Sequence, residues 1–315
     1  YPQRTYINNS TLIMHLYIGL PIAFLAVAAN SPIFALIGGI LFTTALRPPK
    51  NFIPDATGGN LLKTGIVILG LTISSSTAIS LTSYYFFYIS AYVLIIFLVG
   101  ILLAKILRID FKLGLLISSG TAICGATAMA AVSQVINVRP KELLVSIGII
   151  FLFNAFAIIA FPIIGKNLDM SFEQFGFFTA MAIHDTGSVI GAAMAYGDGA
   201  LDTAATLKLL RTLWLIPLIV VLGIFYKDGN SKPQTPLFVI FFVLAIFFGT
   251  TLNLGNEVTG MLKLLSNVLI LGALFCIGTQ INIKSISAIN IRNFSFALIL
   301  WLVALIFSFL FIYIY

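Results

Sequence analysis

The chain of 315 residues is too apolar to be a soluble domain. Hydrophobic residues occupy 60% of its positions, charged residues only 9%, and the mean hydropathy is +1.10, a composition typical of membrane proteins. Its formal net charge is +7, but the Lys and Arg residues are scattered singly, which argues against a nucleic-acid-binding surface. We therefore expect membrane lipid, and no nucleic acid, around this chain.

Apolar segments long enough to cross a bilayer recur along the sequence. Cutting the chain at charged and turn-forming residues predicts eleven membrane-spanning segments. They lie at 11–30, 31–46, 61–80, 83–106, 111–136, 142–164, 172–197, 203–226, 235–253, 259–281 and 291–314. Backbone amides in lipid must bond within their own segment, and these runs are too long and too uniformly apolar for barrel strands, so we assign them to helices. The expected fold is all-α, with one transmembrane domain over residues 1–315.

Positive charges predict the orientation, because loops rich in Lys and Arg remain in the cytoplasm. With eleven alternating segments, one side of the membrane holds the N-terminus and most of the basic residues. That side carries Arg4, Arg47, Lys50, Lys63, Lys105, Arg108, Lys112, Lys166, Lys227, Lys232, Lys284 and Arg292, and the opposite side carries Arg139, Lys141, Lys208, Arg211 and Lys263. We predict a cytoplasmic N-terminus and a C-terminus outside.

A short internal similarity suggests that the chain contains a repeat. Residues 32–34 and 236–238 read Pro-Ile-Phe and Pro-Leu-Phe. Each triplet precedes one apolar segment and, after a loop, a second one of similar length. Inverted repeats that enclose the substrate are common in carriers, although two apolar helices can also resemble each other by chance.

The stretch from Ser118 to Thr127, SSGTAICGAT, carries glycines and hydroxyl groups where a span should be apolar. Glycine permits unusual backbone conformations and hydroxyls can bond the amides that a break releases, so the stretch predicts a helix interrupted near the midplane. A half-helix that begins inside the membrane presents free N–H groups, which suit an anion. The alternative is close helix packing through small residues. Candidate substrate-binding residues here are Ser119, Gly120, Thr121, Cys124, Gly125 and Thr127.

A second stretch, MAIHDTGSVIGAAMAYG at 181–197, contains an adjacent ionisable pair, His184 and Asp185. A charged side chain near the centre of a membrane helix costs about 2.5–3.5 kcal/mol on insertion scales, so the pair must face protein, water or a partner. It could carry a proton, bind a coupling cation, hold a substrate, or simply lock a neighbouring broken helix. The candidate substrate-binding residues here are His184, Asp185, Thr186 and Ser188, and the pair is also a candidate for coupling or gating.

Lys208 and Arg211 lie three residues apart on one face of the next predicted helix. Both lie early in that segment, so they could extend to the membrane interface as ordinary helix-end cations. They could instead line an access path that attracts an anion, with a role in coupling or gating. Asn154, another polar residue within an apolar segment, is interpreted as a bridge between helices.

Enzymatic and metal-dependent functions find no support in the sequence. HExxH, GxSxG, CxxC, Walker and GxGxxG motifs are all absent. Cys124 and Cys276 both lie in apolar runs, which predicts neither a disulfide framework nor a zinc site. A thiol–imidazole pair of Cys124 and His184 would lack a third, orienting group. We expect no enzyme activity, no cofactor and no metal.

The two polar stretches together resemble the motifs of a family of bacterial inner-membrane proteins, the YeiH-like proteins, which carry the provisional name of sulfate exporters. The resemblance lies in GTAICGATA from Gly120, AIHDTGSV from Ala182 and KLLRTLWLIP from Lys208 to Pro217. It implies export of sulfate, a related small oxyanion or a sulfonate across the bacterial inner membrane. By similarity to bile-acid and sodium/proton carriers, it also implies inverted repeats with discontinuous helices that cross at the midplane. The family usually has glutamine four residues after the histidine, where this chain has Ser188, so we expect substrate contacts to differ there.

The leading hypothesis is a secondary transporter of a small anionic solute, driven by an ion gradient. Half-helix N-termini and hydroxyls between Gly120 and Thr127 would bind the anion, while His184 and Asp185 couple or gate its movement with a proton or sodium. The alternatives are a cation/proton antiporter, in which Asp185 binds the cation directly, and an uncoupled, channel-like membrane protein. A homo-oligomer is compatible with each.

Overall fold

The computed structural model describes residues 28–46, 55–226, 237–280 and 290–313, together with positions 21, 24, 25 and 48. Within these ranges all regular secondary structure is helical and no strand occurs, as predicted. The helices are α2 (Pro32–Leu46), α3 (Asp55–Gly70), α4 (Ser75–Ile106), α5 (Phe111–Ala122), α6 (Ala126–Val135), α7 (Pro140–Asn167), α8 (Phe172–Ala182), α9 (Thr186–Tyr196), α10 (Asp198–Leu213), α11 (Leu215–Phe225), α12 (Leu237–Thr251), α13 (Asn256–Gln280) and α15 (Ile291–Tyr313). Most of the predicted segment at 11–30 lies outside the described residues.

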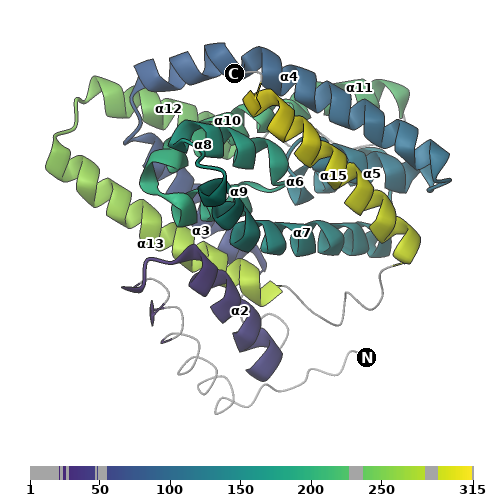
Figure 1. Cartoon of the computed structure of the whole chain (residues 1–315), viewed down its shortest axis with the longest axis horizontal. Coiled ribbons are helices and arrows are strands. Elements are labelled where there is room, and N and C mark those ends of the chain that lie inside the picture. Colours follow the sequence, from purple (N-terminus) through teal and green to yellow (C-terminus); the bar gives the residue numbers. More distant parts are fainter. Residues whose placement is uncertain are drawn as a thin grey trace, which may run out of the picture.

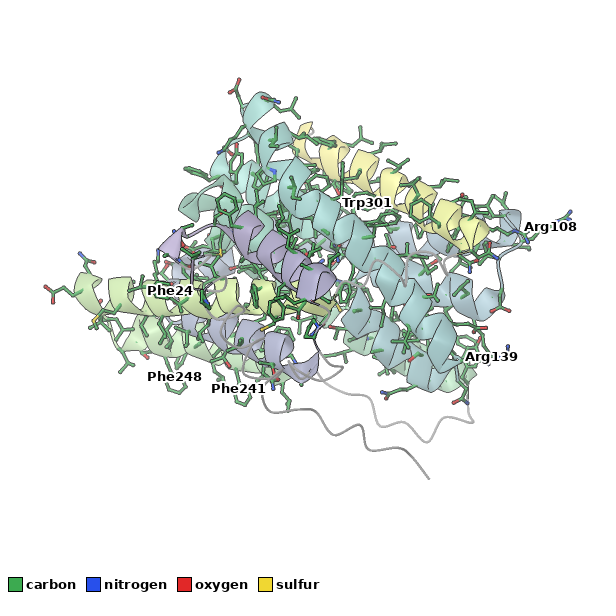
Figure 2. All side chains as sticks on the ribbon, turned by 90° about the horizontal axis from the view of Figure 1, so that it is seen from below. Phe24, Arg108, Arg139, Phe241, Phe248 and Trp301 are labelled. Atoms are coloured by element: carbon green, nitrogen blue, oxygen red, sulfur yellow. The ribbon has the colours of Figure 1, made fainter. Side chains whose placement is uncertain are left out.

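The described helices have the length and the surface of a membrane protein. Five continuous helical stretches are long and apolar enough to cross a bilayer: 75–106, 142–167, 199–225, 256–280 and 291–312. Large apolar side chains cover the outer surface; Phe241 and Phe248 of α12, for example, project away from the body of the molecule (Figure 2) and are both more than half exposed. In water such a surface would aggregate, whereas in lipid it is in contact with its preferred solvent.

The predicted boundary between the segments at 61–80 and 83–106 was wrong. The helix break lies earlier, because α3 ends at Gly70 and α4 begins at Ser75. Ser74 caps α4 by accepting a hydrogen bond from the backbone N–H of Thr77 at 3.2 Å, which is the usual function of serine at a helix start. Residues 71–74 therefore form a turn, and the hydroxyl residues Ser75, Ser76 and Thr77 lie in the first turn of α4.

The helices form two groups, visible in Figure 1. The lateral group consists of α2, α3, α12 and α13, which pack mainly against one another. The central group consists of α4 to α11 and α15. Helix α9 makes most of the contact between the groups, against α2 and α13. Its glycines allow this approach, since Gly187 faces Leu62 and Ile277, and Gly191 faces Leu274.

Two glycines bring α2 and α13 into backbone contact. A Cβ atom built on Gly39 would overlap the carbonyl oxygen of Phe275, and one built on Gly278 would overlap the carbonyl oxygen of Leu36. Small residues at a helix interface allow this close approach in lipid, where van der Waals packing and not the hydrophobic effect drives association. The two glycines therefore determine how tightly the lateral group packs.

We expect Gly278→Ala to lower the stability of the folded protein by about 1–3 kcal/mol, because the added methyl group has no space between the backbones. Gly272→Ala is a matched control on the same helix, since its new Cβ would lie 3.9 Å from the nearest atom, in Leu61. The apparent melting temperature of the detergent-solubilised protein measures both effects. Equal melting temperatures for the two variants would contradict the packing assigned to Gly278.

Candidate functional site

The first predicted interruption is confirmed as a break between α5 and α6. Helix α5 ends at Ala122, and α6 begins at Ala126. Gly125 lies between them with φ of +60° and ψ of −126°, a conformation that is strained for residues with a side chain. The glycine is thus required where the chain leaves one half-helix and enters the next.

The second polar stretch forms a similar break between α8 and α9. Helix α8 ends at Ala182 and α9 begins at Thr186, so Ile183, His184 and Asp185 form the connection. His184 is buried, while Asp185 is half-buried. The ionisable pair predicted from the sequence therefore lies at a break in the helix and not along a continuous helical face.

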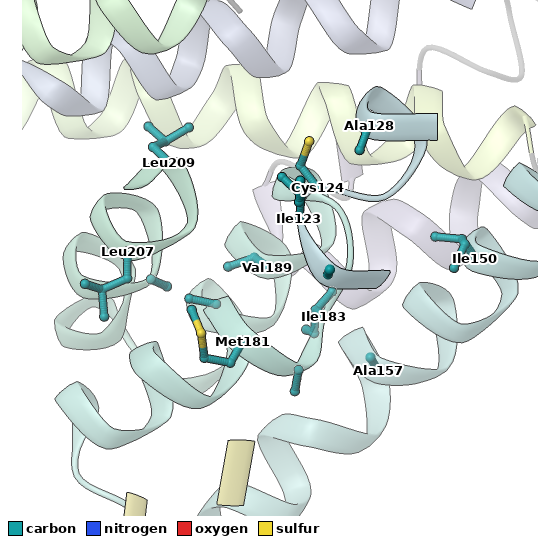
Figure 3. Packing of buried hydrophobic residues seen from close by; sticks show 14 of the residues in the cluster. Ile123, Cys124, Ala128, Ile150, Ala157, Met181, Ile183, Val189, Leu207 and Leu209 are labelled. Atoms are coloured by element: carbon teal, nitrogen blue, oxygen red, sulfur yellow. The ribbon is translucent and has the colours of Figure 1, made fainter. Parts of the chain in front are cut away.

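The two breaks touch each other. A Cβ atom built on Gly125 would lie 3.2 Å from the Cβ of His184 and 3.3 Å from the backbone nitrogen of Asp185. Figure 3 shows Ile123 and Cys124 of the first break near Ile183 of the second. Four half-helix ends therefore converge in the buried centre of the central group.

Arg211 of α10 occupies the carboxyl ends of both interrupted helices. From α5, its Nε bonds to the carbonyl oxygen of Ala122 at 2.8 Å and its Nη2 to that of Thr121. From α8, its Nη1 contacts the carbonyl oxygens of Ala180 at 2.8 Å and Met181 at 2.7 Å. A helix end leaves its last carbonyls without partners, so one planar guanidinium satisfies groups from two helices at once.

Lys208, one helical turn earlier on α10, completes the connection. Its Nζ donates to the carbonyl oxygen of Ile183 at 2.7 Å and to that of Ile123 at 3.3 Å. Trp301 of α15 donates from Nε1 to the carbonyl oxygen of Ala182 at 2.9 Å, and the Tyr92 hydroxyl of α4 donates to Met181 at 2.7 Å. Neither aromatic residue stands out in the sequence, because an isolated Trp or Tyr in an apolar segment carries no distinguishing signal.

The structure excludes one of the two alternatives for Lys208 and Arg211, extension to the membrane interface. They do not reach the membrane interface from a helix end, because Lys208 and Arg211 are both 0% exposed and bond to the breaks. Helix α10 begins at Asp198, five residues before the predicted segment, which places both side chains deeper than expected. Their proposed coupling or gating role stays a prediction.

The two amino ends at the crossing are capped differently. The carboxylate of Asp185 accepts a hydrogen bond from the backbone N–H of Ser188 at 2.9 Å and thereby caps α9. The residue in the same position before α6 is Gly125, which has no side chain, and no side-chain cap is present. The first turn of α6 therefore keeps the partial positive charge of a helix start.

Asn154 of α7 connects the ionisable pair, so the predicted bridge between helices joins His184 and Asp185. Its Oδ1 accepts from the backbone N–H of His184 at 3.2 Å and lies 3.0 Å from His184 Nδ1. Its Nδ2 donates to the carboxylate of Asp185, which also accepts from the Ser188 hydroxyl at 2.6 Å. The sequence provided the residue but not these partners, which lie about thirty positions away.

The remaining candidates divide between the crossing and the surrounding helices. The hydroxyls of Ser118 and Ser119 bond to carbonyls of their own helix, Gly114 at 2.6 Å and Leu116 at 2.8 Å, and not to amides released by the break as predicted. Gly120 packs against Met129. Thr121 and Ser188 are buried near the breaks, Thr186 is half-buried, and Thr127 in the first turn of α6 is exposed.

Comparison with known proteins identifies the family. A family model described as conserved hypothetical protein 698 matches residues 11–297. The chain belongs to this family. It is 38% identical over 86% of its length to a UPF0324 membrane protein of Photobacterium profundum, covering 83% of that relative. A UPF0324 membrane protein of Bacteroides thetaiotaomicron is 33% identical over 90% of this chain and 86% of its own length. No solved structure matches.

Membership of the UPF0324 family confirms the resemblance to YeiH-like membrane proteins. It also confirms that the chain is a membrane protein, since its relatives bear that description. The names of these relatives state no substrate.

We expect Arg211→Gln to destabilise the protein by at least about 3 kcal/mol, because several buried carbonyls would lose their donor and each such loss costs about 1–3 kcal/mol. Arg211→Lys keeps the charge without the planar fork, and we expect an intermediate loss. Thermal unfolding in detergent measures both. The control is Arg139→Gln, whose side chain is 85% exposed. If Arg211→Gln unfolds at the same temperature as the wild type and the control, Arg211 does not hold the crossing together.

Proposed function

We propose that this UPF0324 protein is a secondary carrier for a small anion, such as sulfate or a sulfonate, and that the helix crossing is its binding site. The supporting observation is the meeting of two helix breaks, at Gly125 and His184, inside a membrane protein. Discontinuous helices supply free backbone groups for a solute within the bilayer, where side-chain charges are costly. A transport role, and no enzyme activity, fits this arrangement best.

The charges at the crossing favour an anion. Lys208 and Arg211 contribute two positive charges, and the carboxyl ends of α5 and α8 offset about half a charge each. The amino ends of α6 and α9 add about half a positive charge each, and the carboxylate of Asp185 removes one. The buried crossing keeps about one positive charge, which a single anion would neutralise.

A cation/proton antiporter is the competing function, and the bonding of Asp185 weighs against it. Both carboxylate oxygens already accept hydrogen bonds, Oδ1 from the Ser188 backbone and Oδ2 from Asn154 and the Ser188 hydroxyl. A cation would have to displace these donors. We therefore assign Asp185 to the coupling or gating of anion movement by a proton, which fits the second lone pair of Oδ1 without displacing a donor; a coupling sodium ion would bind elsewhere.

The proposed carrier crosses the bacterial inner membrane eleven times, with its N-terminus in the cytoplasm and an inverted repeat whose halves contribute one broken helix each. Lys208 and Arg211 are buried in a helix and belong to no loop. They therefore no longer count among the basic loop residues of the outer side, which strengthens the predicted orientation. The outer side then retains three of its five basic residues, Arg139, Lys141 and Lys263, against twelve on the cytoplasmic side.

Flux through proteoliposomes tests the proposed function. We expect purified protein to accelerate uptake of radiolabelled sulfate or a sulfonate, in a manner that depends on a proton or sodium gradient. Asp185→Asn should abolish a dependence on the proton gradient, because it removes the ionisable carboxylate at the second break. Uptake that survives Asp185→Asn and ignores the gradient would refute the coupling role. Exchange of sodium for protons without any anion flux would refute the anion carrier.

Labelling of introduced cysteines tests the orientation. In a Cys124→Ala, Cys276→Ala background, we expect Glu257→Cys to react with a membrane-impermeant maleimide in intact cells. Lys166→Cys should react only after permeabilisation, because the eleven-segment topology places it in the cytoplasm. Both positions are exposed helix ends, at the start of α13 and the end of α7. Labelling of both from the same side would contradict this topology.

A further inference from the structure

The hydrogen-bonding partners of Asn154 determine which way its amide faces. One partner is the backbone N–H of His184, which can only donate, at 3.2 Å from Oδ1. The other is the carboxylate of Asp185, an acceptor when ionised, which meets Nδ2. Exchanging the amide oxygen and nitrogen would place donor against donor and acceptor against acceptor. The network therefore permits one orientation of this side chain.

The orientation of Asn154 in turn determines the tautomer of His184. Asn154 Oδ1 lies 3.0 Å from His184 Nδ1. Because this oxygen can only accept, Nδ1 must carry the hydrogen. In the neutral imidazole the lone pair then lies on Nε2. That atom is buried and has no hydrogen-bond partner among the described residues.

The surroundings of His184 favour the neutral ring. Lys208 and Arg211 on α10 both approach the carbonyl oxygen of the preceding residue, Ile183, at 2.7 Å and 3.3 Å, and they repel an added positive charge. The carboxylate of the adjacent residue, Asp185, already accepts hydrogen bonds at both oxygens. The ring faces Phe153 and Trp301, with centroids 6.3 Å and 6.1 Å away, which cannot solvate an imidazolium as water does.

From this geometry we propose that His184 Nε2 accepts a hydrogen bond from a protonated oxygen of the transported anion. This inference rests on the proposed function and ranks the ligands within the small anions: monoprotonated oxyanions, such as hydrogencarbonate or hydrogensulfite, should bind more tightly than sulfate or a sulfonate. A bare acceptor repels the oxygens of a fully deprotonated anion, so sulfate should bind less well. The site's net charge of about +1 also matches a monoanion better than a dianion. A buried acceptor left without its donor discriminates strongly between ligands.

Pairs of monoanions of similar size, one with an O–H group and one without, test this substrate class. Hydrogencarbonate and nitrate are both planar monoanions, but only the first carries an O–H group; hydrogensulfite and methanesulfonate form a similar sulfur pair. Near neutral pH we expect the O–H member of each pair to bind at least about tenfold more tightly. Trp301 fluorescence in a Trp214→Phe background reports binding, because these are the chain's two tryptophans and Trp301 lies beside His184. Thermal shift of the unmodified protein provides a second readout.

His184→Phe serves as the matched variant, because it keeps an aromatic ring beside the stacked rings of Phe153 and Trp301 and removes the acceptor. We expect it to lose the preference within each pair while remaining folded. Equal binding of nitrate and hydrogencarbonate by the wild type, or sulfate as the tightest ligand, would overturn the inference and leave an anion carrier in place. A preference that persists in His184→Phe would also overturn it. Binding of none of these anions, with sodium-dependent stabilisation instead, would overturn the proposed function as well.

Discussion

The structure depends on how two interrupted helices satisfy their carbonyl groups inside a membrane. Breaking a helix in lipid leaves the last carbonyls of its first half without partners, and no water is present to replace them. Here one side chain, Arg211, donates to carbonyls at the ends of both α5 and α8, and Lys208 donates to Ile123 and Ile183. Because each cation bridges both breaks, the two half-helix pairs are held against each other.

At the crossing, the groups that hold the broken helices together differ from the groups that would select a ligand. The carbonyl ends are occupied by cations, so those positive charges neutralise the breaks before any solute arrives. The amino ends differ, since Asp185 caps α9 while α6 begins at a glycine. Asn154 links Asp185 to His184, whose Nε2 has no hydrogen-bond partner within the described part of the chain. In the proposed carrier, a charge balance of about one positive unit and this hydrogen-bond polarity are the properties that would select a ligand.

Local patterns predicted much of this fold, and long-range partners could not be predicted. Apolar runs predicted the helices, and the cluster of glycine and hydroxyl residues around Cys124 predicted the first break. Both predictions succeeded because backbone freedom and local polarity are properties of the residues themselves. The contacts of Arg211 join positions about 30 and 90 residues apart, which only the packing of α10 against both breaks can establish. The start of α4 was misjudged for a simpler reason: Ser74 was read as part of a span, although serine commonly caps a helix.

The most direct test of the account is an experimental structure of the protein with hydrogensulfite bound. The account predicts density for the anion at the contact between Gly125 and His184, with an oxygen within hydrogen-bonding distance of His184 Nε2. It also predicts that Arg211 remains bonded to the carbonyls of α5 and α8. Density elsewhere, or an Arg211 side chain that has left those carbonyls to bind the anion, would contradict the claim that the cations hold the crossing while other groups select the ligand.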